Sequence, residues 1–319
     1  MQPLENRCGS QNAGASRRDF IQQATGLAAG MAAFAAATPA AAAPASGLLP
    51  TVRLGAHDIT RLILGGNPVY GHAHFNKILS QYMTNWHTPQ RVLELLQRAE
   101  QAGINTWQNS YDVRTLQDVD RFREAGIKLH WLCLGKPDWD QNPDRIDDAA
   151  KHRPIGIAPH GALAERLHRQ QRLTVLTDLL KRIRDQGVLV GLSAHNPALI
   201  ELSEEKGWDV DYYMCCLYYL TRPRDEFSKL LGGNLPLGEI YLPSDPERMF
   251  KVIRGVRKPC LVYKVLAAGR RLGEIRLCFE TALSNVKPTD ALIVGMYQQF
   301  GDQVGENTAL VREICSRMP

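Results

Sequence analysis

The sequence predicts a closed (β/α)8 barrel, the TIM-barrel fold, preceded by a β-hairpin. Eight short apolar runs of strand length follow one another along the chain. Amphipathic segments with a period of about 3.6 residues separate these runs, and one more follows the last run. Strands that alternate with helices are typical of parallel sheets, and eight such repeats are the number that closes a barrel.

The elements follow in a regular order. Residues 51–61 alternate around a Gly-Ala-His-Asp turn and predict the hairpin. Gly103 and Gly187 each stand where a helix ends before the next strand, which suits a C-terminal cap. We expect strands at 62–64, 104–107, 129–134, 155–158, 188–192, 212–217, 260–265 and 291–294, and the clearest helices at 89–102, 171–186, 245–256 and 303–315.

The alternative to a barrel is a doubly wound open sheet. That fold usually carries a glycine-rich first turn, but the residues after the first strand read L-G-G-N-P at 64–68 and lack the G-x-G-x-x-G pattern. The longest loops are expected at 67–88 and 220–244, each after a strand. Because a barrel places its chemistry in such loops, the barrel is the favoured prediction.

The first 43 residues are interpreted as a twin-arginine signal peptide. Arg17 and Arg18 stand in S-R-R-D-F-I-Q, and an Ala/Gly-rich, weakly apolar stretch follows. This stretch is too short and too rich in alanine for a stable membrane span. We therefore expect export by the twin-arginine translocation machinery to the periplasm or the medium, a linker at 44–50 and the barrel at 51–319. The alternative is a disordered alanine-rich tail.

Charge and cysteine content indicate which partners and which cysteine states to expect. The net charge is +5, but the basic residues are scattered, so a nucleic-acid partner is not expected. Beyond the signal peptide, six cysteines remain, most of them inside apolar runs. We expect them to be free thiols, because buried cysteine usually behaves as a small apolar residue and no C-x-x-C pair occurs.

Polar side chains follow consecutive predicted strands at their carboxyl ends, which meet at one mouth of a barrel. Any one of them has a structural alternative: a surface lysine, a histidine that caps a loop, or a Lys264 that pairs with a carboxylate inside the barrel. Their coincidence at one end favours a functional site. The residues are Gln108, Asn109, Tyr111 and Asp112, then Lys136, then His160, then His195 and Asn196, and finally Lys264 with Arg270 beyond it.

The order and spacing of several segments resemble the aldo-keto reductases over about residues 51–316. The segments are V-R-L-G at 52–55, R-L-I-L-G-G at 61–66, G-I-N at 103–105, G-L-S-A-H-N-P at 191–197, I-V-G-M at 293–296 and Q-V-G-E-N at 303–307. This resemblance implies a barrel that reduces carbonyls with a nicotinamide cofactor. It also implies a tetrad in which a lysine paired with an aspartate lowers the pKa of a catalytic tyrosine.

By this resemblance, Lys136 matches the lysine of the tetrad and His160 matches its histidine. The aspartate position falls on Gln108, and the tyrosine position falls near Val113, with Tyr111 and Tyr70 able to reach the same space. A neutral amide cannot stabilise a lysine cation as a carboxylate does. If NADP is retained, the resemblance assigns its binding to Ser193, Asn196, Gly295, Gln303, Glu306 and Asn307, but the loop at 296–300 has no basic residue for the 2′-phosphate.

The favoured hypothesis is acid–base chemistry, such as elimination, hydration or isomerisation, on a small carbonyl- or hydroxyl-rich substrate that could derive from a sugar. A histidine would be the base and a lysine ammonium would stabilise the oxyanion. Substrate contacts are expected from Asn109, Asp112, Asn196, Tyr70, Trp86 and Arg270.

Three alternatives remain open. One is an NADP-dependent oxidoreductase that holds its cofactor tightly and uses Tyr111 or Tyr70 as proton donor. Another is a metal enzyme that uses His72 and His74 of the first loop with His160, His195 and Asp112, because imidazole and carboxylate suit zinc. The last is a binding protein without catalysis.

Overall fold

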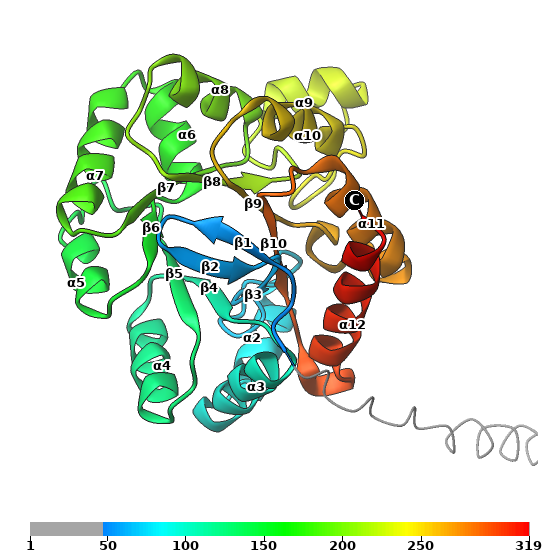
Figure 1. Ribbon diagram of the computed structural model, residues 1–319. Coiled ribbons are helices and arrows are strands. Elements are labelled where there is room, and N and C mark those ends of the chain that lie inside the picture. The colour runs from blue at the N-terminus through cyan, green and yellow to red at the C-terminus, as the bar shows by residue number, and fades with distance from the viewer. Residues whose placement is uncertain (1–46, 319) are drawn as a thin grey trace, which may run out of the picture. The chain divides into compact units, whose positions relative to one another are not determined.

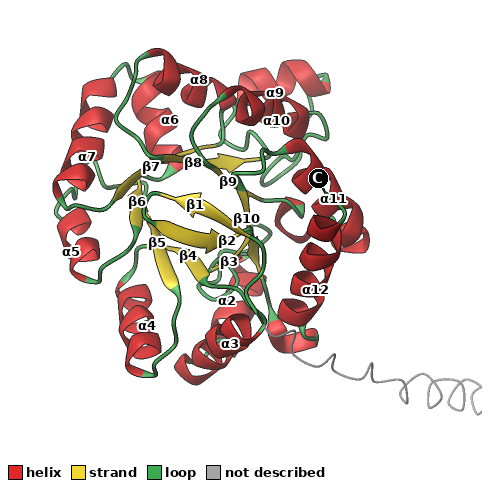
Figure 2. Ribbon diagram, in the orientation of Figure 1, coloured by secondary structure: helices red, strands yellow, loops and turns green. Residues whose placement is uncertain are grey.

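The computed structural model describes residues 47–318, and the predicted signal peptide lies outside the described residues. Eight parallel strands form a closed barrel in the order β10-β3-β4-β5-β6-β7-β8-β9, which confirms the predicted fold. A ring of helices surrounds the strands (Figures 1 and 2). The strands are β3 (Leu62–Gly65), β4 (Thr106–Ser110), β5 (His130–Leu134), β6 (Gly156–Ala158), β7 (Leu189–Ala194), β8 (Tyr212–Cys216), β9 (Cys260–Tyr263) and β10 (Ala291–Gly295).

The predicted hairpin consists of β1 (Thr51–Leu54) and β2 (His57–Thr60), and it crosses the end of the barrel at which the strands begin (Figure 1). Its turn is tighter than predicted, because Gly55 adopts a φ of 58° and the chain enters β2 at His57. Asn105 ties the hairpin to the barrel: its Oδ1 accepts from the Thr60 amide at 2.8 Å, and its Nδ2 donates to the Asp58 carbonyl at 2.8 Å. This tie explains why β4 begins later than predicted.

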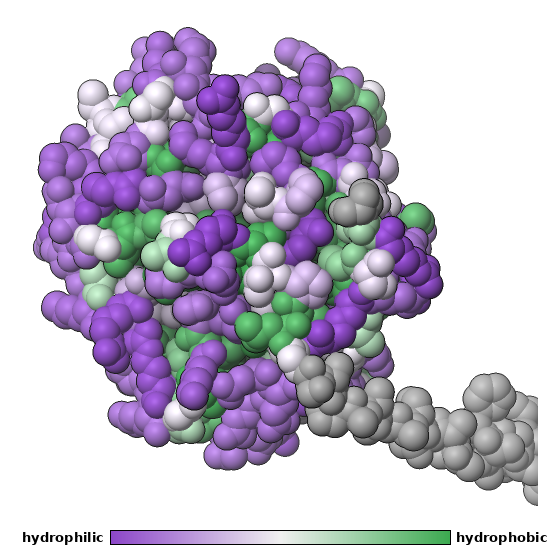
Figure 3. Space-filling view, viewed as in Figure 1, coloured by the Kyte–Doolittle hydropathy of each residue, from purple (hydrophilic) through white to green (hydrophobic). Residues whose placement is uncertain are grey.

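Figure 3 shows this hairpin face of the molecule. Hydrophilic side chains cover most of it, and apolar side chains lie in small separate areas. The carboxyl ends of the strands, which carry the predicted site residues, lie at the opposite end of the barrel. All eight strands run parallel and away from the hairpin.

The helices follow the predicted periodicity closely. The two long loops that were expected after the first and sixth barrel strands each contain a helix, α2 and α9. The helices are α2 (Lys77–Trp86), α3 (Pro89–Gln101), α4 (Val113–Glu124), α5 (Arg145–Lys151), α6 (Gly161–Arg169), α7 (Leu173–Asp185), α8 (Pro197–Glu205), α9 (Arg224–Leu231), α10 (Asp245–Gly255), α11 (Ile275–Asn285) and α12 (Gln303–Ser316).

Side chains alternate between the barrel interior and the helix layer along each strand. An inner cluster joins the hairpin to the strands and includes Leu54, Ile63, Leu132, Tyr212 and Leu261. Two glycines make room for the Tyr212 ring: a Cβ at Gly191 would lie 2.4 Å from its Cζ, and one at Gly156 would lie 3.0 Å from its Cε1. Side chains therefore fill the barrel interior next to the hairpin.

All six cysteines of the described residues are free thiols, and five of them are buried, as the apolar context of these cysteines predicts. None of the helices in the described part of the chain has the length and apolar character that a bilayer crossing requires.

Candidate functional site

The structure brings four ionisable side chains of the sequence prediction to the carboxyl ends of the strands, and we call them the cup: Lys136, His160, His195 and Lys264. The ring centroids of His160 and His195 lie 6.2 Å apart. Burial lowers the pKa of His160, the charge of the neighbouring His195 adds to this effect, and Lys136 makes a smaller contribution of the same sign. The cup is therefore built from four strand ends, those of β5, β6, β7 and β9.

Lys136 has a carboxylate partner, although Gln108 is an amide. Its Nζ lies 3.3 Å from Oδ2 of Asp112, four residues after Gln108 in the chain. Asp112 also caps α4, because its Oδ1 accepts from the Arg114 amide at 3.3 Å. The prediction that Lys136 lacks an anchor because Gln108 is neutral is therefore wrong, since tertiary folding supplies the charge from a different position. Asp112 holds the lysine and need not bind substrate itself.

Three other predicted residues point away from the cup. Asn109 is buried in the helix layer, where its Oδ1 accepts from the Trp131 indole at 2.6 Å. The Tyr111 hydroxyl donates to Asp148 at 2.8 Å, and the Tyr70 hydroxyl donates to Asp118 at 3.1 Å. Burial and Asp148 raise the pKa of Tyr111 to about 12. Gln108 is buried on the inner side of β4. Neither tyrosine is placed to donate a proton in the cup.

His160 presents one defined tautomer when neutral. Its Nδ1 accepts from the Ala162 amide at 3.1 Å and so caps α6. A nitrogen that accepts this hydrogen bond carries no proton, so the proton of the neutral ring is on Nε2. Burial, followed by the charge of His195, lowers the pKa of His160 to about 3. At neutral pH, His160 is therefore a hydrogen-bond donor through Nε2–H.

His195 has a buried partner that the sequence patterns did not indicate, Glu165 on α6. The Glu165 Oε2 lies 3.4 Å from Nδ1 of His195, and its Oε1 accepts from the backbone amides of His195 at 2.5 Å and Asn196 at 2.6 Å. Thr221 donates a further hydrogen bond to Oε2. Burial alone would raise the pKa of Glu165, but the hydrogen bonds from His195, Thr221 and Asn196 reverse this effect and lower it.

The carboxylate of Glu165 is thus ionised within the helix layer and lies beside the Nδ1 of His195. Its side chain is only 2% exposed. A signal for it existed in the sequence: Glu165 lies between Ala164 and Leu167 on the apolar side of α6. A carboxylate on a buried helix face needs partners, and the next strand end supplies them.

Lys264 differs from Lys136 in having no partner. Within residues 47–318 its ammonium makes neither a hydrogen bond nor an ion pair, since the nearby acid Glu239 is paired with His74 at 2.8 Å. Its backbone has a φ of 64°, a left-handed conformation that residues other than glycine rarely adopt. Burial lowers the pKa of Lys264, Glu239 opposes this effect and Arg270 adds to it. The predicted alternative of an ion pair inside the barrel is not what the structure contains.

Three loops meet beside Lys264 and form a clasp, which consists of His74, Phe75, Glu239, Tyr241 and Arg270. His74 bonds Glu239 through Nδ1, and Tyr241 donates to the other Glu239 oxygen at 2.7 Å. The Arg270 guanidinium lies 4.0 Å from the Tyr241 ring centroid and 4.3 Å from that of Phe75. Arg270, predicted to bind substrate, thus joins the loops that follow β3, β8 and β9.

Two further residues of the first loop lie at different places. His72 reaches solvent at the rim, where partial burial of the ring, followed by the charge of Lys136, lowers its pKa to about 4. Trp86, predicted to bind substrate, ends α2 and packs edge-on against Tyr297, with the ring centroids 5.2 Å apart. Trp86 therefore connects the first loop to the loop after β10 and does not line the cup.

The residues that the resemblance assigns to NADP are engaged in the fold. Ser193 is fully buried with its Oγ 3.2 Å from the Tyr263 hydroxyl, and Asn196 caps α8 through the Ala198 amide at 3.1 Å. Gln303 accepts from the Tyr297 amide at 2.7 Å, and Asn307 is buried. Gly295 and Glu306 are exposed.

The amino end of α12, where a cofactor phosphate would lie, carries an acid instead. Asp302 accepts from the Gly305 amide at 3.0 Å, and the one nearby cation, Arg98, contacts the same carboxylate at 2.5 Å. A phosphate would meet a like charge at this helix end. The residues present at this end of the barrel do not fit NADP.

The predicted zinc ligands are separated. His74 bonds Glu239 through one ring nitrogen and lies 3.3 Å from the Asn67 amide with the other, while Asp112 pairs with Lys136. Across the range 47–318, no three His, Cys, Asp or Glu side chains form a group that could hold a metal ion.

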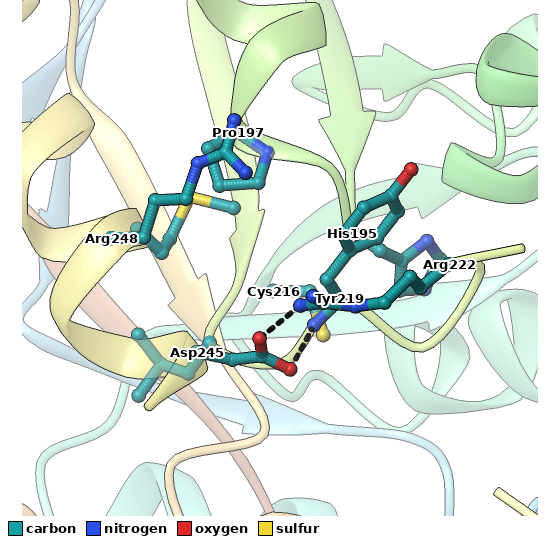
Figure 4. Close-up of a pocket in the computed structure, with 9 residues that line it drawn as sticks. His195, Pro197, Cys216, Tyr219, Arg222, Asp245 and Arg248 are labelled. Atoms are coloured by element: carbon teal, nitrogen blue, oxygen red, sulfur yellow. Dashed lines mark hydrogen bonds and ion pairs between the residues drawn. The ribbon is translucent and has the colours of Figure 1, made fainter. Parts of the chain in front are cut away.

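A small pocket lies behind the cup, between β8 and α10 (Figure 4). In it, Asp245 binds the Arg222 guanidinium and accepts from the Tyr219 amide at 3.1 Å, and His195 forms part of the wall. Its free volume is about 10 Å³, which is about the space of one water molecule. A sugar-sized substrate does not fit there, so the open mouth is the candidate site.

Comparisons with known proteins agree on the architecture. No protein-family model matches the chain, and no curated protein matches it in sequence. Among solved structures, the glycerol dehydrogenase AKR11B4 from Gluconobacter oxydans is similar with a TM-score of 0.50 at 12% identity, covering 84% of this chain and 95% of that one.

Two other barrels are similar at lower scores. A truncated 3-deoxy-D-arabino-heptulosonate 7-phosphate synthase from Thermotoga maritima has a TM-score of 0.48 at 14% identity, covering 84% of this chain and 92% of that one. The native KDPGal structure has a TM-score of 0.44 at 11% identity, covering 80% of this chain and 91% of that one. At these sequence identities the comparisons show only the TIM-barrel fold. An aldo-keto reductase is one of several barrel enzymes whose structures are similar to this chain.

Proposed function

We propose that this protein is a barrel enzyme that transfers protons on a small substrate carrying a carbonyl group and neighbouring hydroxyl groups. The observation that carries the proposal is the Glu165–His195 pair, with 3.4 Å between Oε2 and Nδ1, at a strand end that faces a neutral His160 and the Lys136 ammonium. A base, a hydrogen-bond donor and a cation are the groups that proton abstraction beside a carbonyl requires.

His195 is the proton acceptor in this proposal. When its ring takes a proton from the carbon beside the carbonyl, the buried carboxylate of Glu165 offsets the new positive charge. Because Glu165 also accepts from the His195 and Asn196 amides, its carboxylate is held beside the ring before substrate arrives. His160, which the resemblance matches to the histidine of the tetrad, has its Nδ1 occupied and a lowered pKa, so it suits the role of donor.

The electron pair released at carbon moves to the carbonyl oxygen, which becomes an enolate. The Nε2–H of His160 and the ammonium of Lys136 are the groups that bind this oxygen, and Asp112 holds Lys136 in place. Return of the proton to the neighbouring carbon isomerises the substrate, whereas loss of a hydroxyl group from the next carbon completes an elimination. The substrate class is a small polyhydroxy aldehyde, ketone or acid, because all four cup residues are polar.

We further propose that the chain is a divergent relative of the aldo-keto reductases that has lost nicotinamide chemistry. The hairpin below the barrel and the order of the sequence segments support this relationship, and the acid at the start of α12 supports the loss of the cofactor. The purified protein should then carry no nicotinamide absorbance and leave NADPH fluorescence unchanged on titration.

The proton-transfer reaction can be tested with a panel of candidate substrates. Small aldoses, ketoses and uronic acids are incubated with the protein in D2O, and deuterium incorporation next to the carbonyl is followed by NMR. We expect at least one compound to exchange, and His195→Asn to slow that exchange by about 100-fold, the usual contribution of a positioned base.

The matched control is His152→Asn. His152 also pairs with a carboxylate, since its Nδ1 lies 2.9 Å from Asp120, but it ends α5 at the hairpin end of the barrel. Its replacement should leave exchange unchanged. Failure of every compound to exchange, or equal rates in His195→Asn and the wild type, would rule the proposed function out.

A further inference from the structure

Lys264 is the one cup residue that the proton-transfer proposal leaves without a task. Lys136 is paired with Asp112 and stays an ammonium, whereas the side-chain amine of Lys264 makes no hydrogen bond or ion pair within residues 47–318. The acid that could have paired with it, Glu239, is already bound by His74 and Tyr241 in the clasp. The cup thus contains two amines in different states.

The surroundings of Lys264 favour an uncharged amine. The residue is half-buried between the apolar end of β9 and the clasp, and burial lowers its pKa; the Glu239 carboxylate opposes this effect and the Arg270 guanidinium adds a smaller contribution to it. A lysine that is desolvated and close to another cation is the arrangement in which the amine acts as a nucleophile toward carbonyl compounds. The left-handed backbone at Lys264, with φ of 64°, is also the kind of local strain that collects at functional sites.

We infer that Lys264 is a covalent catalytic residue whose Nζ forms an imine with the carbonyl group of the substrate in the cup. This inference rests on the proposed function, because it takes the same substrate class and the same mouth of the barrel. In it the substrate loses its proton as an imine, so that an enamine on Lys264 replaces the enolate, and the two lysines have different roles.

Imine formation by Lys264 needs no further reactant. The Nζ lone pair forms a bond to the carbonyl carbon while the π electrons move to oxygen, and proton transfers give a carbinolamine. Loss of the hydroxyl group as water leaves a C=N bond, which is protonated. The protonated imine then withdraws electrons from the adjacent C–H bond, so that His195 takes the proton more easily and an enamine forms. Water hydrolyses the product imine and returns the free amine.

The experiment traps the imine by reduction. The full-length protein is incubated with glycolaldehyde or with dihydroxyacetone, together with sodium cyanoborohydride, which reduces imines faster than carbonyls. The expected product has the mass of the protein plus the probe minus one oxygen atom, and peptide mapping should place it on Lys264. Labelling should be faster at Lys264 than at Lys181 or Lys206, because burial lowers the pKa of Lys264 and so raises its free-amine fraction at neutral pH.

Lys181 and Lys206 are the internal comparison, since their side chains are 73% and 55% exposed. The variant Lys264→Arg keeps a cation of similar length but cannot form an imine. We expect it to lose the label while its circular dichroism and melting temperature remain those of the wild type. If it unfolds, peptide mapping of the wild type still decides the site.

The inference would be overturned if the most exposed lysines were labelled fastest. It would also be overturned if neither probe labelled Lys264. The two proposals fail separately. If Lys264→Arg exchanges deuterium at the wild-type rate, the imine proposal is wrong, but the proposal that His195 transfers the proton is unaffected. Absence of exchange with every compound, despite an imine at Lys264, would remove the proton-transfer function instead.

Discussion

Glu165 shows how a single buried carboxylate organises the cup. Its two oxygens contact the His195 amide and ring, the Asn196 amide and the Thr221 hydroxyl, so it joins α6 to the end of β7 and to the loop after β8. A buried charge is tolerated only when it is compensated in this way. In the proposed mechanism Glu165 is a positioning residue, because it acts through His195 and does not touch substrate.

The variant Glu165→Gln keeps the size of the side chain but removes its charge. One of its terminal atoms becomes an NH2 donor, which cannot accept from the His195 amide or the Thr221 hydroxyl. We expect deuterium exchange to fall by about 100-fold or more, since the base loses both its orientation and its compensating charge.

Thr221→Val provides the control for this prediction. It removes one hydrogen bond to Glu165 and keeps the carboxylate, so we expect a loss of about 1.5–3 kcal/mol in the free energy of unfolding, typical of a hydrogen bond to a charged group. Exchange should stay within a few-fold of the wild type. Equal losses of exchange in both variants would mean that Glu165 serves stability alone.

At the scale of elements, the barrel strands are short and regular, whereas the loops after β3, β8 and β9 decide the shape of the mouth. The clasp joins these loops through His74, Glu239, Tyr241 and Arg270. Because the Glu239 oxygens are engaged there, Glu239 makes no ion pair with Lys264, although its charge still acts on the amine. The clasp thus shapes the site indirectly, by engaging the acid that lies nearest to this amine.

The clasp should contribute to stability in a pH-dependent manner. Burial alone would raise the pKa of Glu239, but the hydrogen bond and the charge of His74 lower it from 4.5 to about 2. A carboxylate with a lowered pKa stabilises the fold above its unfolded pKa, and this contribution is lost as the pH falls toward the folded value. The contribution should therefore be complete above about pH 5 and disappear toward about pH 2.

Glu239→Gln tests this prediction. Its side chain is 36% exposed, so we expect a loss of only about 0.2–1 kcal/mol at pH 7, as for surface ion pairs. Denaturant unfolding of both proteins as a function of pH should show the difference shrinking below about pH 4.5. Glu247→Gln, at a 77% exposed acid on α10, should show little difference at any pH. A constant difference for Glu239→Gln down to pH 2 would contradict the assignment.

At the scale of the whole molecule, the described residues form a closed barrel capped by a hairpin, and the sequence places a twin-arginine pattern before it. We propose that the chain is exported to the periplasm or the medium after folding. The pattern S-R-R-D-F-I-Q and the small-residue stretch that follows support this proposal.

Export can be measured by cell fractionation. Changing both Arg17 and Arg18 to Lys should retain the protein in the cytoplasm with its N-terminal segment uncleaved, because the translocation machinery reads the arginine pair. Arg7→Lys, outside the pattern, is the matched control and should be exported and processed normally. Normal export of the double variant would show that the N-terminal segment is not a twin-arginine signal.

The sequence by itself determined the barrel, its hairpin and the end of the barrel at which the candidate site residues gather. Periodicity is a local property, so runs such as 212–217 and helices such as 245–256 could be placed to within a few residues. The convergence of His160, His195, Lys136 and Lys264 followed from the parallel order of the strands alone. The free state of the cysteines followed from their apolar neighbours.

The tertiary structure decided which of these side chains act together, because contacts between segments distant in sequence leave no local pattern. Asp112 became the partner of Lys136, Glu165 the partner of His195, and Tyr111 and Asn109 turned into the helix layer. Side-chain direction at a strand end changes with each residue, so a position error of one residue reverses it. Within the described residues, Lys264 remained unpaired because the fold directs Glu239 to His74, a choice made by loops that are distant in the sequence.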